Sequence, residues 1–180
     1  MMTTKKPIHV LLLCATLCLA HGANATTDGF NSVQCGTDIA KALVGKTLPN
    51  DSVSALEARH KAIALKDLGA TEVSDSLDVI SWQICGDEYM VLQDKHNLVR
   101  DVMPAPAHSK TKPAFIGNCT ANGKAAPGVV VAILDNAKPG DNLSATLAWK
   151  IDAAKAKFVK VPEAGLSCPR SGIATVDGGL

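Results

Sequence analysis

The sequence predicts an α+β fold in which one or two short N-terminal helices precede antiparallel β-meanders arranged in two halves. Three observations lead to this prediction. Apolar residues recur at helical spacing between residues 37 and 68. From residue 77 onward the apolar period changes to two, which is typical of strands. Four of the six cysteines lie beyond residue 25, and we expect them to stabilise the fold as two disulfides.

Residues 1–25 have the three parts of a cleavable signal peptide. Lys5 and Lys6 precede an apolar run from Ile8 to Ala20, and small residues follow up to Ala25. The apolar run is shorter than the roughly 20 residues that a membrane-spanning helix needs. We therefore expect an exported protein without a membrane span, cleaved after Ala25 and located in the bacterial periplasm or outside the cell.

A proline-rich segment divides the rest of the chain. Residues 104–114 hold three prolines among Ala, His, Ser, Lys and Thr, a composition that continues neither a helix nor a central strand. We interpret this segment as a linker. It separates residues 26–103, a helix plus three-strand antiparallel half, from residues 115–180, a mostly β half with an irregular C-terminal tail.

The four cysteines distribute evenly between the two halves. Four cysteines allow three pairings, but bonds within each half can form without any docking of one half on the other. We therefore predict the disulfides Cys35–Cys85 and Cys119–Cys168. The chain contains no Cys-x-x-Cys pair, so neither a thioredoxin-like redox site nor a zinc ribbon has the spacing it needs.

Two helices are predicted in the first half. Thr37 or Asp38 can cap a short helix that ends before Gly45. A longer helix is predicted from Ser52 to Leu68, because Ser54 and Glu57 have capping-box spacing and a glycine follows the run. The alternative that residues 62–66 form a short strand stays open.

Three strands complete the first half. The first runs from Leu77, with Ile80, Trp82 and Ile84 on one face. The pair Gly86-Asp87 is of the type that closes a two-residue hairpin. The hairpin leads into the second strand, residues 89–92, and a polar loop of residues 93–97 leads into the third, residues 98–103.

The second half is predicted to be nearly all strand. After a strand at residues 115–119 and a loop, the unbroken apolar run of residues 129–134 is expected in the middle of a sheet. Residues 143–151 alternate between apolar and polar, which predicts a strand with Trp149 on its buried face and one wet face. A return strand at residues 156–161 and an irregular tail follow.

Composition excludes some classes of partner. Lys and Arg number 18 and Asp and Glu 17, and this balance does not favour nucleic acid or an anionic membrane. Aromatic residues make up only 3% of the chain, which argues against stacking platforms for bases or sugars.

Candidate catalytic and metal-binding residues are few. Glu57 and His60 form a Glu-x-x-His pair, which on a helix places a carboxylate and an imidazole on one face. Carboxylate-bridged metal sites use that pair twice, and the sequence has no second copy. No serine lies in a Gly-x-Ser-x-Gly elbow. We therefore predict no catalytic residue and no cofactor, with Glu57 and His60 as weak metal-ligand candidates.

Four lysines make the last hairpin locally basic. They could contact an acidic partner protein, or they could keep a sheet edge from pairing with other strands. These are Lys150, Lys155, Lys157 and Lys160.

One short segment resembles a known family. Cys35-Gly36 followed by Leu43-Val44-Gly45 is similar to the opening of small, potato-inhibitor-like bacterial protease inhibitors. The likeness covers about a dozen residues, the rest of the chain departs from that pattern, and no site residue follows from it.

Together these observations favour a non-enzymatic binding protein of the bacterial cell envelope, of the inhibitor or immunity-protein type. The expected partner is another envelope or extracellular protein. Two alternatives stay open. One is an envelope assembly or scaffold module, and the other is a hydrolase or metal-dependent enzyme with a dispersed site around Glu57 and His60.

Overall fold

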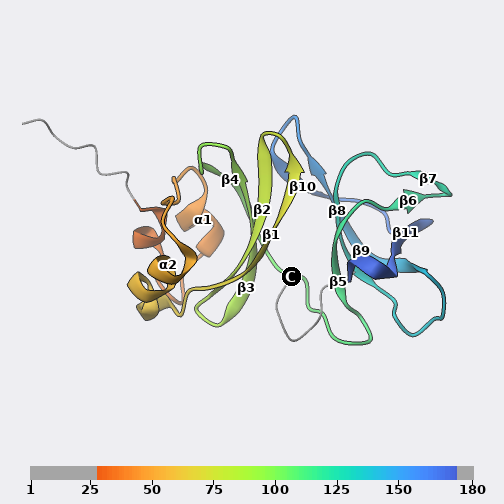
Figure 1. The fold of residues 1–180 in the computed structure, drawn as a ribbon, viewed down its shortest axis with the longest axis horizontal. Coiled ribbons are helices and arrows are strands. Elements are labelled where there is room, and N and C mark those ends of the chain that lie inside the picture. Colours follow the sequence, from red (N-terminus) through yellow and green to blue (C-terminus); the bar gives the residue numbers. More distant parts are fainter. Residues whose placement is uncertain (1–27, 174–180) are drawn as a thin grey trace, which may run out of the picture.

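The computed structural model describes residues 28–173 and has a layered α+β architecture (Figure 1). Short helices cover one face of a four-stranded antiparallel sheet, and a second antiparallel sheet packs on its other face. The predicted fold class is confirmed. The predicted signal peptide, residues 1–25, lies outside the described residues.

The helical layer comes first in the chain. It consists of α1 (Ile39–Leu43) and α2 (Val53–Arg59), with two 3-10 helices, η1 (Gly29–Ser32) and η2 (Lys61–Ile63). Asp38 caps α1 as predicted, because its carboxylate accepts a hydrogen bond from the Lys41 backbone N–H at 3.0 Å. A third 3-10 helix, η3 (Arg170–Gly172), ends the described part of the chain.

The first sheet is a meander in the order β1 (Lys66–Ser74), β2 (Leu77–Ile84), β3 (Asp87–Asp94) and β4 (Val99–Pro104). The second sheet has the order β5 (Ala114–Gly117), β8 (Val130–Leu134), β9 (Asn142–Asp152), β11 (Leu166–Pro169), β6 (Thr120–Ala121) and β7 (Lys124–Ala125). In addition, β10 (Lys157–Lys160) pairs with β9. The proline-rich segment connects the two sheets.

The prediction of a long helix over Ser52–Leu68 is wrong, and so is that of three strands in the first half. The helix α2 ends at Arg59, and after η2 the left-handed conformation of Ala64 (φ 48°) turns the chain into a fourth strand, β1. The alternative of a short strand at residues 62–66 is also wrong, since η2 includes residues 62 and 63 and of this segment only Lys66 belongs to β1. Pairing along the whole of β2 outweighs helix propensity here.

The hairpin between β2 and β3 is centred one residue earlier than predicted. Ile84 pairs with Asp87, so Cys85 and Gly86 are the two central residues of the turn. Both have positive φ, 57° and 92°, as turns matched to the twist of a hairpin require. Cys85 is therefore held in a conformation that glycine adopts at lower cost.

The prediction that β9 has one wet face is wrong. A register shift between the pairs Ile133–Leu147 and Leu134–Ala145 places Thr146 as an extra residue in β9. Ala145 consequently packs in the core of the C-terminal half, whereas Trp149 packs between the two sheets. Leu147, which a regular alternation would place on the same buried face as Trp149, is 37% exposed.

The C-terminal half is also more regular than predicted. The Asn122-Gly123 loop is the tip of a hairpin formed by β6 and β7, and the tail contributes β11, which pairs with both β9 and β6. The Arg170 guanidinium donates to the carbonyl oxygens of Gly140 and Lys138, which fixes the loop before β9.

Three apolar cores hold the layers together. The first lies between the helices and the first sheet, the second between the two sheets, and the third on the outer face of the second sheet. Asp101 of β4 adds a polar link between the sheets, since its carboxylate accepts hydrogen bonds from Lys157 Nζ at 3.1 Å and from the Phe158 backbone N–H at 2.9 Å.

Both predicted disulfides are present. Cys35–Cys85 links the loop before α1 to the tip of the β2–β3 hairpin, with a Cα–Cα distance of 5.4 Å. Cys119–Cys168 links the start of the β6–β7 hairpin to β11, with a Cα–Cα distance of 4.3 Å. Each bond stays within one half of the chain.

The two tryptophans give a direct test of this layering. Trp82 is 3% exposed in the first core, whereas Trp149 is half-buried between the sheets. We expect Trp82→Ala to lower the free energy of unfolding by about 3–5 kcal/mol and Trp149→Ala by about half as much. Urea unfolding of the two variants measures both values. Equal losses would contradict the difference in burial between Trp82 and Trp149.

Candidate functional site

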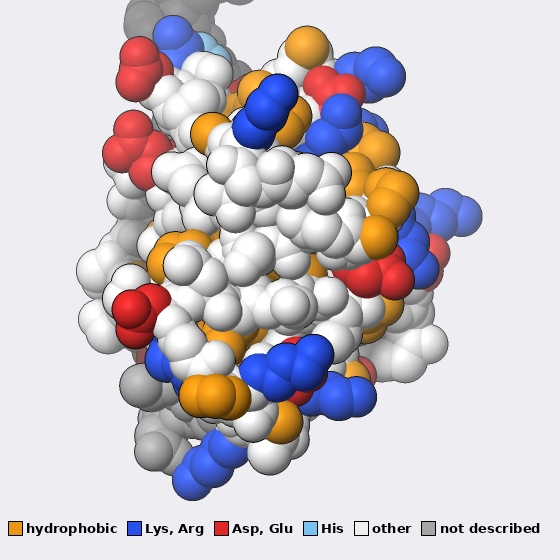
Figure 2. Space-filling view, turned by 90° about the vertical axis from the view of Figure 1, so that its right-hand side faces the viewer, with side chains coloured by type: hydrophobic (Ala, Val, Ile, Leu, Met, Phe, Trp, Pro, Cys, Tyr) orange, Lys and Arg blue, Asp and Glu red, His pale blue; other side chains and the backbone are white. Residues whose placement is uncertain are grey.

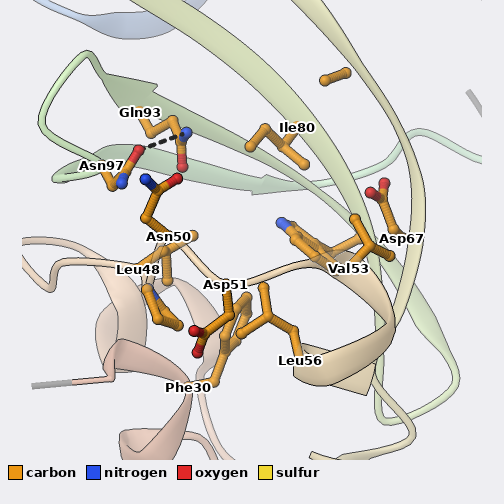
Figure 3. A pocket seen from close by; sticks show the side chains of 13 residues that line it. Phe30, Leu48, Asn50, Asp51, Val53, Leu56, Asp67, Ile80, Gln93 and Asn97 are labelled. Atoms are coloured by element: carbon orange, nitrogen blue, oxygen red, sulfur yellow. Dashed lines mark hydrogen bonds between the residues drawn. The ribbon is translucent and has the colours of Figure 1, made fainter. Parts of the chain in front are cut away.

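A pocket of about 170 Å³ opens between the helical layer and the first sheet (Figure 3). Its walls come from η1, the segment between α1 and α2, the first turns of α2, and strands β1 to β3 and the loop after them. The lining residues are Phe30, Leu48, Pro49, Asn50, Asp51, Val53, Leu56, Asp67, Ala70, Ile80, Trp82, Gln93 and Asn97.

The apolar part of the pocket belongs to the first core. Phe30 and Trp82 meet edge to face, with ring centroids 5.3 Å apart, and both are almost fully buried. The indole Nε1 of Trp82 is buried and has no hydrogen-bond partner among the described residues. An unpaired buried N–H is costly, so an acceptor that reached this donor would be stabilised by it.

Three amide side chains form the polar part. Figure 3 shows Asn50, Gln93 and Asn97 on one side of the pocket, with Val53 and Asp67 on the other. Gln93 is 8% exposed, and its Nε2 donates to Asn97 Oδ1 at 3.4 Å. The position of Asn97 is fixed by backbone hydrogen bonds to Asp94 and Leu48. Amides offer both donors and acceptors, so this wall can bind an uncharged polar group.

The carboxylates of the pocket are already bound to the protein. Asp51 forms an ion pair with Arg59, and Asp67 accepts a hydrogen bond from the Gly69 backbone N–H at 2.7 Å. No lysine or arginine is among the lining residues. The pocket therefore favours a neutral or cationic occupant over an anionic one.

A buried ionic cluster lies beside the pocket. Asp28, 8% exposed, accepts hydrogen bonds from the Phe30 backbone N–H and from Arg59 Nη1, both at 3.0 Å, and its Oδ2 lies 2.8 Å from His60 Nε2. Burial raises the pKa of Asp28, but the hydrogen bonds from His60, Arg59 and Phe30 lower it further, so the net shift is downward. In its ionised form, Asp28 therefore links the start of η1 to α2 through hydrogen bonds.

Glu57 and His60 do not converge. The Glu57 carboxylate accepts a hydrogen bond from the Asp67 backbone N–H at 3.0 Å at the start of β1, whereas His60 pairs with Asp28. Neither residue lines the pocket. Within residues 28–173, no group of three or more His, Cys, Asp or Glu side chains is arranged to hold a metal ion.

The four lysines of the last hairpin differ in their ion pairs. Lys157 pairs with Asp101 of β4, and Lys155 pairs with Asp152 in its own turn. Lys150 and Lys160 form no ion pair with any residue between 28 and 173. The lysines therefore differ in how free they are to contact a partner.

The sequence did not point to this pocket. Gln93 was assigned to a loop, yet it belongs to β3, directly after three fully buried residues. An amide that directly follows such an apolar run can mark a polar site. Extending the predicted strand, residues 89–92, by two residues would have included Gln93.

Comparison with known protein families, with curated proteins and with solved structures finds no match to this chain. Within the described residues, no helix is both long and apolar enough to cross a membrane.

Proposed function

We propose that this chain is an exported, non-enzymatic binding protein of the bacterial cell envelope, of the inhibitor or immunity-protein type. It binds an extended segment of another envelope or extracellular protein along the edge of β1 and inserts one side chain of that segment into the Trp82 pocket. The observation that carries this proposal is the position of the pocket directly beside an unpaired strand edge.

The outer edge of β1 is open to a further strand. In the sheet order β1 is terminal, and no other strand among residues 28–173 pairs with its outer side. The Asp67 N–H at the start of this edge already donates to Glu57. No backbone hydrogen bond from another segment of the described chain, residues 28–173, occupies the outer side of residues 70–74. An exposed edge of this kind can bind an extended peptide through main-chain hydrogen bonds.

The Trp82 pocket lies next to the same strand. Asp67 and Ala70 of β1 are also lining residues of the pocket, so a strand added to β1 would run past its opening. Edge pairing gives affinity, while a neighbouring pocket gives specificity for one side chain. The apolar floor, the amide wall and the unpaired Trp82 N–H fit an uncharged side chain with an acceptor oxygen, such as glutamine or threonine.

Other features favour binding over the two alternatives. The titratable groups beside the pocket, Asp28, Arg59 and His60, hold one another in structural hydrogen bonds. Among residues 28–173, the exposed large apolar side chains are Val44, Val53 and Leu147, which come from separate parts of the fold rather than from one broad patch of the kind that an assembly module uses. Two disulfides are typical of an oxidising compartment, which supports a periplasmic or secreted location.

Two exposed valines allow a matched test. Val53, 42% exposed, lines the pocket, and Val44, 40% exposed, does not. The tagged chain would be used to capture its partner from an envelope extract, and the partner would then be purified and titrated by calorimetry. We expect Val53→Arg to weaken binding at least tenfold and Val44→Arg to change it less than twofold.

Hydrogen exchange of the same complex tests the strand edge. Backbone amides of residues 70–74 should gain protection when the purified partner binds, and those of the β6–β7 hairpin should not. A partner that binds Val53→Arg as tightly as it binds the unmodified chain, or that protects only residues outside β1, would contradict the proposal.

A further inference from the structure

A second pocket, of about 260 Å³, lies on the outer face of the second sheet. It is formed by the β6–β7 hairpin and the segment that follows it, by β8 and β9, and by the chain between β10 and β11. Its lining residues are Ala121, Ala126, Pro127, Val130, Lys150, Val161, Pro162 and Leu166. Figure 2 looks onto the end of the molecule that carries these hairpins, where apolar side chains show among polar ones and basic side chains lie mostly toward the margin.

The walls of this pocket are held in place by the backbone. Leu166 pairs with Ala121 across β11 and β6, and the Ala126 N–H donates to the Cys119 carbonyl at 2.9 Å. The Val161 N–H donates to the Ala148 carbonyl at 3.0 Å. The disulfide between Cys119 and Cys168 joins the same elements. The pocket is therefore formed before any ligand arrives, as small-molecule sites usually are.

Lys150 is the single charged side chain among the lining residues, and every other lining side chain is apolar. It extends from β9 between Val130 and Val159, its register partners on β8 and β10. Within residues 28–173 it forms no ion pair, whereas its neighbours Lys155 and Lys157 each have an aspartate. An ammonium group among apolar side chains is stabilised by an anion that arrives with its own apolar part.

We propose that this pocket binds a small apolar monocarboxylate of the fatty-acid class, with its carboxylate at Lys150 and its hydrocarbon chain against Val130 and Leu166. An apolar cavity of about 150 Å³ holds a benzene ring, so a pocket of 260 Å³ has room for a chain of roughly eight to ten carbons. The inference does not depend on the function proposed for the Trp82 pocket, because the two pockets share no lining residue.

Titration calorimetry with octanoate, hexanoate and 1-octanol tests the proposal. Octanoate should bind at least tenfold more tightly than 1-octanol, which has the same chain but no charge. Hexanoate should bind about fifteenfold more weakly than octanoate, since each buried methylene changes affinity about fourfold.

Two lysine variants test the role of the charge. Lys150→Met should weaken octanoate binding at least tenfold and leave 1-octanol binding unchanged. Lys160→Met is the matched control, because Lys160 pairs with Trp149 and so faces the opposite side of the sheet. It should bind octanoate within twofold of the unmodified chain.

A third variant tests the location without touching the charge. Ala126 is partly exposed at the pocket, so Ala126→Trp should fill the pocket and abolish binding of octanoate, with an unchanged melting curve as evidence that the variant folds. Equal affinity for octanoate and 1-octanol, equal losses in Lys150→Met and Lys160→Met, or octanoate binding that persists in Ala126→Trp would each overturn the proposal. Absence of octanoate binding at millimolar concentration would overturn it as well.

Discussion

Replacing Cys35 and Cys85 together by alanine is expected to lower the free energy of unfolding by about 4 kcal/mol, because the bond closes a loop of 50 residues in the unfolded chain. The bond also attaches the helical layer to the tip of the β2–β3 hairpin, so its loss loosens the first core. Chemical unfolding followed by circular dichroism measures the change, and many small exported domains do not survive such a loss at body temperature.

A second variant separates the bond from the turn in which Cys85 lies. Because Cys85 has a φ of 57°, Cys35→Ala with Cys85→Gly should be about 1 kcal/mol more stable than Cys35→Ala with Cys85→Ala. Both variants lack the disulfide, so the difference reports only the left-handed backbone. Equal stability of the two variants would mean that Cys85 does not hold this conformation in solution.

Replacing Asp28 by alanine is expected to cost about 3 kcal/mol, because the buried His60 Nε2 and the Phe30 backbone N–H lose the carboxylate with which they form hydrogen bonds. Asp51 is the matched control. It pairs with the same guanidinium of Arg59 but is 42% exposed, whereas Asp28 is 8% exposed. Exposed ion pairs contribute little, so Asp51→Ala should cost about 1 kcal/mol at most. Similar losses in the two variants would contradict the buried cluster.

The same carboxylate makes stability depend on pH. The pKa of Asp28 is lower in the folded protein than the usual value of about 3.9 in an unfolded chain. Its contribution is therefore complete at neutral pH and is lost as the pH falls through the folded-state pKa. Between about pH 5 and pH 2, the unmodified protein should lose more stability than Asp28→Ala does. Parallel pH profiles of the two proteins would show that Asp28 is not perturbed.

The sequence predicted those features that depend on local pattern and on chain connectivity. The alternation of Ile80, Trp82 and Ile84 identified β2, and the even division of cysteines by the proline-rich segment was sufficient to predict both disulfides. The prediction of β2 succeeded because side chains on one face of a strand recur with a period of two. The cap of α1 at Asp38 is equally local.

The predictions that failed depend on partners distant in sequence. The residues of β1 form a strand because β2 provides its hydrogen bonds, and their own pattern is weak. The bulge at Thr146 reverses the faces of β9 beyond it, and a single sequence does not mark where an extra residue is inserted. The Trp82 pocket was missed for the same reason, since its lining residues come from segments more than 60 positions apart, from Phe30 to Asn97.

The position of β11 between β9 and β6 determines the order in which the second sheet can be completed during synthesis. The β6–β7 hairpin is made early, but its sheet neighbour lies 47 residues later, where Thr120 bonds to Ser167. Until that segment emerges, the thiol of Cys119 has no native partner, while Cys35 and Cys85 can already be oxidised. A nascent chain halted before residue 166 would therefore carry one finished disulfide and one reactive thiol, which makes the redox state of Cys119 a direct indicator of whether the chain is whole.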